Sequence, residues 1–118
     1  MKTYCAATVF SVKSVEESLK FYTDILGFTE DFRFEEYAGV KHEEVLIHLS
    51  QNYPHWRPPG SGAIYIYCDD VDDFYAQIKA KGCETQNEPQ DWPYEMRDFT
   101  AFDVDGNQIT FGHETSQG

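Results

Sequence analysis

The sequence predicts an α+β fold made of two βαβββ modules, whose curved mixed sheets present a concave ligand-binding side. Two observations carry this prediction. Residues 4–50 follow the order strand, amphipathic helix and three further strands, and residues 62–112 repeat that order. The repeat spans roughly 50 residues and occurs only twice, whereas a solenoid needs at least three copies to bury a core. We therefore expect a single domain over residues 1–118, with a Pro- and Gly-rich linker at 51–61 between the modules.

The first module opens with a β-rich run at 4–12. Ser14 and Glu17 form a capping box, which predicts the start of a helix. The helix covers 15–26, buries one apolar face and ends at Gly27. That face consists of Val15, Leu19, Tyr22 and Leu26. Strands are predicted at 28–35, 37–41 and 43–50, with a hairpin in the Ala38-Gly39 region.

The second module opens with a predicted strand at 63–68. Asp70 caps a helix over 71–81, and Asp73 lies in its first turn, where the helix dipole favours an acid. Residues 103–107 predict a hairpin turn and not a calcium loop, because the glycine is the fourth residue and not the sixth. The remaining expectations are strands at 83–88, 96–102 and 108–112 and a loop at 89–94.

The composition narrows the function classes. A hydrophobic fraction of 41% excludes a disordered chain, and a formal net charge of −12 argues against a nucleic-acid partner. No apolar run approaches the roughly 20 residues that span a bilayer, and the start has no secretory signal pattern. Three cysteines, an odd number, favour reduced thiols and a cytoplasmic location. The acidity serves either solubility alone or the attraction of a cationic ligand.

Alternation along the strands predicts which side chains face away from the helices. The aliphatic set should lie beneath the helices, and the concave wall should carry His48, Tyr65, Tyr67 and Thr110. Such a wall is too polar for a filled core and has the aromatic surface typical of small-molecule pockets. The alternative is that the tyrosines pack at a subunit interface.

Two segments resemble the vicinal oxygen chelate superfamily, which covers glyoxalase I, extradiol dioxygenases, epimerases and antibiotic-resistance binders. They are VEESLKFYTDILGF at 15–28 and RDFTAFDVDGNQITF at 97–111. Within the superfamily, the chain is most similar to the bleomycin resistance proteins, through DFRFEEYAGV at 31–40 and PYEMRDF at 93–99.

The superfamily's enzymes hold a divalent metal at four concave positions, which align with Ala7, His48, Ala63 and Thr110. Alanine has no donor atom, threonine is a poor neutral ligand, and His48 alone cannot hold a catalytic metal. We therefore expect neither a metal nor another cofactor, and a binding protein more than an enzyme. The alternatives are a metal-dependent lyase, isomerase or dioxygenase of this fold with unusual ligands, and a dimerisation module without a ligand.

The resemblance implies a homodimer that exchanges its N-terminal strand and sequesters a cationic, partly flat drug in crevices between subunits. Tyr37 and Tyr94 match the stacking aromatics of the resistance proteins, although Tyr94 replaces a usual tryptophan and Glu95 a usual glycine. Neighbouring acids would attract the cation. The candidate ligand-binding residues are Asp31, Phe32, Glu35, Glu36, Tyr37, His48, Tyr65, Tyr67, Tyr94, Glu95, Asp98 and Phe99.

Overall fold

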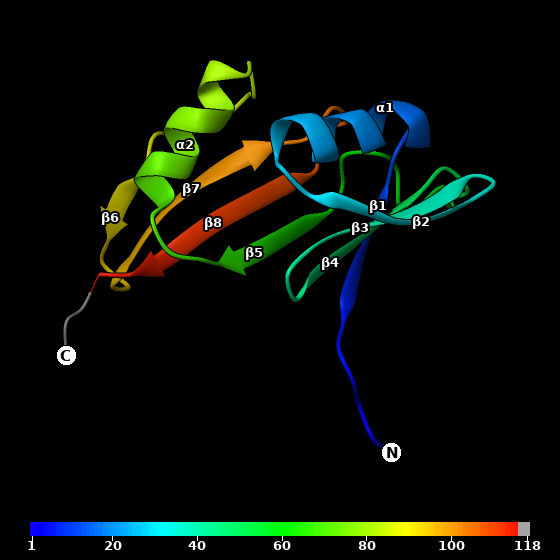
Figure 1. The fold of residues 1–118 in the computed structure, drawn as a ribbon, viewed down its shortest axis with the longest axis horizontal. Coiled ribbons are helices and arrows are strands. Elements are labelled where there is room, and N and C mark those ends of the chain that lie inside the picture. Colours follow the sequence, from blue (N-terminus) through cyan, green and yellow to red (C-terminus); the bar gives the residue numbers. More distant parts are fainter. Residues whose placement is uncertain (116–118) are drawn as a thin grey trace.

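The computed structural model describes residues 1–115 and contains two four-stranded mixed sheets, each carrying one helical segment (Figure 1). The first strand of each sheet runs parallel to its neighbour, and the other pairs are antiparallel. The first sheet has the order β1-β4-β3-β2, with β1 (Ala7–Ser11), β2 (Thr29–Phe34), β3 (Tyr37–His42) and β4 (Val45–Ser50). The second has the order β5-β8-β7-β6, with β5 (Ala63–Tyr67), β6 (Gln90–Trp92), β7 (Met96–Phe102) and β8 (Gln108–Glu114). The predicted fold class is confirmed, whereas the predicted module boundaries stay a prediction.

Both helices begin where the capping residues predict. Helix α1 (Val15–Lys20) starts after Ser14, whose hydroxyl accepts a hydrogen bond from the Glu17 amide at 3.1 Å. Helix α2 (Val71–Ala80) starts after Asp70, which caps the Asp73 amide in the same way. The apolar face predicted for the first helix is buried. The predicted continuous α-helix is nevertheless wrong in its second half, because the chain widens into a π-helical turn, η1 (Phe21–Ile25).

The hairpins of the first sheet differ from the prediction. Ala38 and Gly39 lie inside β3, and the chain reverses at 35–36 and 43–44. Glu35 and Glu43 supply the positive φ that such two-residue turns require, with φ of 52° at each. Gly39 has a different role, because a Cβ at this position would overlap the ring of Phe32. The glycine signal therefore marks a close approach and not a turn.

The predicted strand at 83–88 is also wrong. Only Thr85 forms a bridge, to Ala101, and the edge strand β6 lies inside the segment predicted as a loop. Pro89 explains the interruption because it has no N–H to donate to the neighbouring strand. A three-residue turn then joins β6 to β7, and Glu95 adopts a φ of 62° in it.

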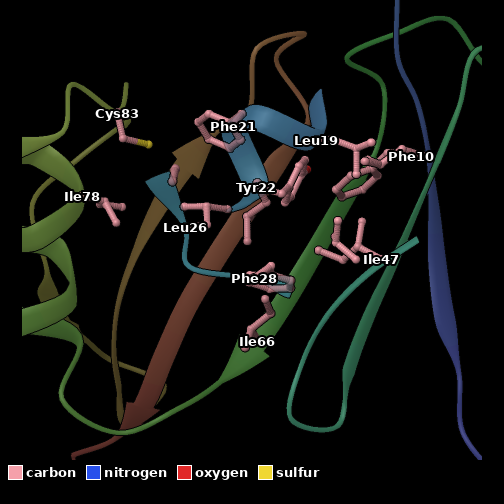
Figure 2. Packing of buried hydrophobic residues seen from close by; sticks show 14 of the residues in the cluster. Phe10, Leu19, Phe21, Tyr22, Leu26, Phe28, Ile47, Ile66, Ile78 and Cys83 are labelled. Carbon is pink, nitrogen blue, oxygen red and sulfur yellow. The ribbon is translucent and has the colours of Figure 1, made fainter. Parts of the chain in front are cut away.

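The two modules meet along a shared core and a buried polar turn. Figure 2 shows Phe28 and Ile66, which come from different modules, among the buried hydrophobic residues. The segment 103–107 forms the predicted hairpin turn, closed by a 3.0 Å bond from the Asp103 amide to the Asn107 carbonyl. The Tyr22 hydroxyl donates to Asp103 at 2.9 Å, which ties η1 to the second sheet. Neither helical segment within residues 1–115 has the length and apolarity needed to cross a membrane.

Candidate ligand-binding faces

Each sheet has one face packed against a helix and one face without a helix, which we call its open face. In the first sheet, Ala38, Val40, Ile47 and Leu49 lie buried in the core. Strand alternation turns their neighbours the other way, and Tyr37 and His48 therefore lie on the first open face, with Phe32 opposite Gly39. In the second sheet, Asp98 pairs with Gly112 and Tyr65 with Thr110, which places them on the second open face.

The first open face carries a packed aromatic cluster. The Phe32 and Tyr37 rings stack with centroids 6.1 Å apart and an interplanar angle of 17°. His48 meets Phe32 edge-on at 5.1 Å, and its Nδ1 is 2.8 Å from the Tyr37 hydroxyl oxygen. Burial raises the pKa of Tyr37, an effect that the positive charge of Arg57 partly offsets. The phenol is therefore protonated at neutral pH and is held in place by the imidazole.

The second open face is organised around a buried carboxylate. Asp98 is only 5% exposed and accepts hydrogen bonds from the hydroxyls of Tyr65 (2.7 Å) and Tyr94 (2.9 Å). Burial and these bonds to the carboxylate raise the pKa of both phenols. Gly112 leaves room for this arrangement, because a Cβ there would overlap the Tyr65 hydroxyl. The Trp92 and Tyr94 rings lie parallel, with an interplanar angle of 3° and centroids 6.3 Å apart.

Both open faces are hollowed beside these clusters. A space of about 330 Å³ adjoins Tyr37 and the Glu35–Glu36 turn, and one of about 460 Å³ adjoins Tyr65, Tyr94 and Asp98. Each module thus presents a parallel aromatic pair whose tyrosine is fixed by a polar side chain. The polar group is an imidazole in the first module and a carboxylate in the second.

Residues 5–111 match the profile of the Glyoxalase/Bleomycin resistance protein/Dioxygenase superfamily. The chain belongs to this superfamily. A bleomycin resistance protein from Geobacillus stearothermophilus is 29% identical over 117 residues, which cover 85% of this chain and 89% of that protein. A bleomycin resistance protein from Staphylococcus aureus matches to the same extent.

Solved structures of the superfamily share the fold. A member from Sphaerobacter thermophilus DSM 20745 superposes with a TM-score of 0.84 at 25% identity, covering 96% of this chain and 98% of that one. TnmS3, an antibiotic binding protein from Streptomyces sp. CB03234, superposes with a TM-score of 0.76 at 25% identity, covering 97% and 99%. The family relationship therefore supports a binding role at the level of the family.

The metal-ligand positions of the superfamily's enzymes do not fit a metal in this chain. The Thr110 hydroxyl, a weak neutral ligand, is hydrogen-bonded to Thr100 at 2.7 Å, and His48 alone supplies too few ligands for a catalytic metal. Ala7 and Ala63 offer no donor atoms. Residues 1–115 also contain no other group of three or more His, Cys, Asp or Glu side chains that could hold a metal ion.

The structure brings most of the sequence-predicted site residues into two groups. The first is Phe32, Tyr37 and His48, with Glu35 and Glu36 in the adjoining turn. The second is Tyr65, Tyr94 and Asp98, with Glu95 in the next turn and Tyr67 stacked at a tilt 5.2 Å from Tyr65.

Two predicted residues lie elsewhere. Asp31 is at a bulge in β2 and pairs with Lys41 at 3.6 Å. Phe99 is fully buried beneath α2, with its ring 5.2 Å from that of Tyr75. Alternation from Asp98 would have assigned Phe99 to the core.

Sequence reasoning also left several residues beside the faces unassigned, among them Thr100, Gln86 and Arg57. Thr100 and Gln86 line the hollow of the second face, and Arg57 acts on Tyr37 from the linker. Alternation from Asp98 could have found Thr100. Gln86 and Arg57 carry no comparable signal in the sequence.

Proposed function

We propose that this chain binds and sequesters a cationic, partly flat small molecule without altering it, in the manner of a bleomycin-type resistance protein. The observation that carries the proposal is the second open face, where a buried carboxylate fixes two tyrosines beside a parallel Trp–Tyr pair. The curated relatives named as bleomycin resistance proteins, and the antibiotic binding protein of the same fold, support it.

The flat part of the ligand would stack on the fixed aromatic rings. Tyr37 and Tyr94 are each anchored by their hydroxyl group, so little side-chain freedom is lost when a ligand covers the ring. Such stacking contributes on the order of 0.5–1.5 kcal/mol per aromatic beyond the area buried. Tyr94 remains 59% exposed, which leaves its ring accessible.

The cationic part would be attracted by the acids around the faces. Asp98 is desolvated, so a charge-assisted hydrogen bond to it is stronger than one to a surface acid. Glu35, Glu36 and Glu95 surround the faces in turns, and the net charge of −12 adds long-range attraction that raises the association rate. Glu35 and Glu95 carry this charge on residues with a positive φ, a backbone conformation that glycine adopts at lower energy.

The proposal includes a homodimer that exchanges N-terminal strands. Residues 1–6 extend away from the body of the chain on the side opposite the helices (Figure 1), and Tyr4 is 85% exposed. Strands β1 and β5 each have a neighbour on one side only. A hollow of about 580 Å³ lies between them and could receive the extended segment of a second copy. In such a dimer, the first open face of one subunit would complete a crevice with the second open face of its partner. We also place the protein in the cytoplasm, consistent with its three free cysteines.

Calorimetric titration with bleomycin tests the proposal. We expect saturable binding, and we expect the Tyr94→Ala variant to bind about 10-fold more weakly because it loses a stacking ring. Trp56→Ala is the matched control, since Trp56 is an exposed aromatic of the linker at 71% exposure. Equal affinity of the parent and Tyr94→Ala proteins would remove the stacking argument. Stoichiometric nickel or zinc in the purified protein, lost in His48→Ala and accompanied by hemithioacetal isomerisation, would replace the binding function with an enzymatic one.

A further inference from the structure

A separate hollow lies on the helix-bearing side of the molecule, between the two modules. It measures about 320 Å³. Its floor is formed by buried side chains of both modules, Leu26 and Phe28 from the first and Ile66 and Phe111 from the second. Figure 2 shows Leu26, Phe28 and Ile66 in this region. The hollow is therefore distinct from the open faces, which lie on the other side of the sheets.

Two aromatic pairs line this hollow. Phe28 contacts the His42 ring with centroids 5.7 Å apart, and Phe74 contacts Phe111 edge-on at 4.8 Å. The first pair belongs to one module and the second pair to the other. A flat apolar group entering the hollow would therefore contact aromatic surface from two directions.

The mouth of the hollow is acidic. Asp69 and Asp70 are exposed and line it just before α2, and none of the described residues that line it is Lys or Arg. Burial, together with the charge of Asp69, raises the pKa of the neighbouring Cys68 thiol, so this group stays neutral at physiological pH. The lining therefore combines an apolar interior with negative charge at its entrance.

We propose that this hollow is a second binding site, specific for a small arylalkylamine that carries one positive charge on an otherwise apolar body. Its volume is at the lower end of the range of ligand pockets, which suits one aromatic ring with a short chain. The ring would lie between the two aromatic pairs and the ammonium group would point toward Asp69 and Asp70. The site does not depend on the proposed function of the open faces.

Phenethylammonium is the probe for the test, with 2-phenylethanol as its neutral counterpart and 3-phenylpropionate as its anionic one. We expect saturable NMR shifts at Gly27, Ile66 and Gln77 with phenethylammonium, weaker shifts with the alcohol and none with the acid. Asp69→Asn should weaken binding roughly fivefold, since it removes a partly exposed charge partner. Glu88→Gln changes the net charge equally at an exposed position away from the hollow and should have no effect.

Blocking the mouth of the hollow provides a second, independent test of the proposal. Gln77→Trp places a large ring at the entrance and should abolish the shifts, whereas Ala76→Trp, on the neighbouring exposed position of α2, should preserve them. Equal binding by these two variants would overturn the proposal. NMR shifts confined to Tyr65 and Tyr94, which mark the open faces, would also overturn it. So would sedimentation data showing that the hollow is covered in a dimer and that Gln77→Trp disrupts this dimer.

Discussion

Single hydrogen-bonded residues determine the chemistry of the open faces. Asp98 on β7 and His48 on β4 are each hydrogen-bonded to a tyrosine hydroxyl, yet one is a buried carboxylate and the other an imidazole. In the function proposed above, the two faces would therefore hold different parts of the ligand, with the cationic part at the second face. A similar pairing of a tyrosine with an acid occurs at the module junction, where Tyr22 donates to Asp103.

The Tyr22–Asp103 pair predicts a pH-dependent loss of stability. Burial and the neighbouring carboxylate raise the pKa of Tyr22 well above that of the unfolded chain, which is about 10. Because the folded state favours the protonated phenol, the Tyr22–Asp103 pair stabilises the fold below a pH of about 10. This contribution is lost as the pH rises through the pKa of Tyr22 in the folded state. Tyr22→Phe should therefore lower the free energy of unfolding by about 1–3 kcal/mol at pH 7, because Asp103 loses a buried donor.

Denaturant unfolding at pH 7 and at about pH 10.5 measures this effect. We expect the difference in the free energy of unfolding between the parent and Tyr22→Phe proteins to be smaller at the higher pH. Only the parent must keep the Tyr22 phenol protonated. A difference that stays constant across this range would contradict the assigned cause.

At the scale of elements, the hairpin turns carry the clearest mismatch between residue type and backbone conformation. The turns at 35–36, 43–44 and 93–95 each place a glutamate at positive φ. A side chain in this conformation costs roughly 1–2 kcal/mol relative to the ordinary helical region, a cost that glycine avoids. Glycine loses part of this advantage because its unfolded state has more conformational freedom.

The Glu43→Gly variant should therefore be more stable than the parent, by about 0.5–1 kcal/mol in the free energy of unfolding. Glu44→Gly is the matched control, because Glu44 lies in the same turn without a positive φ, and it should be neutral or destabilising. Thermal unfolding of the three proteins distinguishes these cases. If both variants lose stability, the turn conformation does not carry the expected cost.

At the scale of the whole molecule, one fully buried amide joins the modules. The Asn107 side chain donates to the Ser11 carbonyl at 3.2 Å and to Asp103 at 2.9 Å, and it accepts a bond from the Gly62 amide at 2.9 Å. These partners belong to β1, to the 103–107 turn and to the residue just before β5. The turn therefore fastens the two sheets in addition to reversing the chain.

Asn107→Ala should lower the free energy of unfolding by about 2–4 kcal/mol, because it leaves several buried polar groups without a partner. Asn87→Ala removes an amide that bonds to the carbonyl of the next residue at 2.8 Å, and it should have little effect. Hydrogen exchange at Ser11, Gly62 and Asp105 would show whether the loss is centred on the module junction. Equal stability of the two variants would mean that the junction is held by the apolar core alone.

The success of sequence analysis varied with the range of the interactions involved. The capping residues Ser14 and Asp70 act within one helical turn, so their neighbours in the sequence were sufficient to place both helices. The glycine at position 39 was misjudged because its partner, Phe32, lies on a neighbouring strand. The edge strand was misplaced because the chain hydrogen-bonds to β7 at 84–86, bends at Gln86 and Asn87, and forms regular pairs with β7 only at 90–92. A family resemblance predicted Tyr37, Tyr94 and Asp98 as site residues, but it did not predict the hydrogen bonds of the two tyrosine hydroxyls to His48 and Asp98.

The sequence by itself determined the doubled module, the helix starts, the acidic charge and the absence of the usual metal-binding residues at three of four positions, because these depend on residue type and short-range periodicity. Only the tertiary structure decided which acids are buried, which tyrosines are anchored and which aromatic residues are withdrawn into the core. Asp98 and Phe99 are adjacent in the chain, yet one accepts two hydroxyl hydrogen bonds on an open face and the other packs beneath α2. The physical reason is that desolvation and hydrogen bonding depend on neighbours brought together by strand pairing and sheet packing.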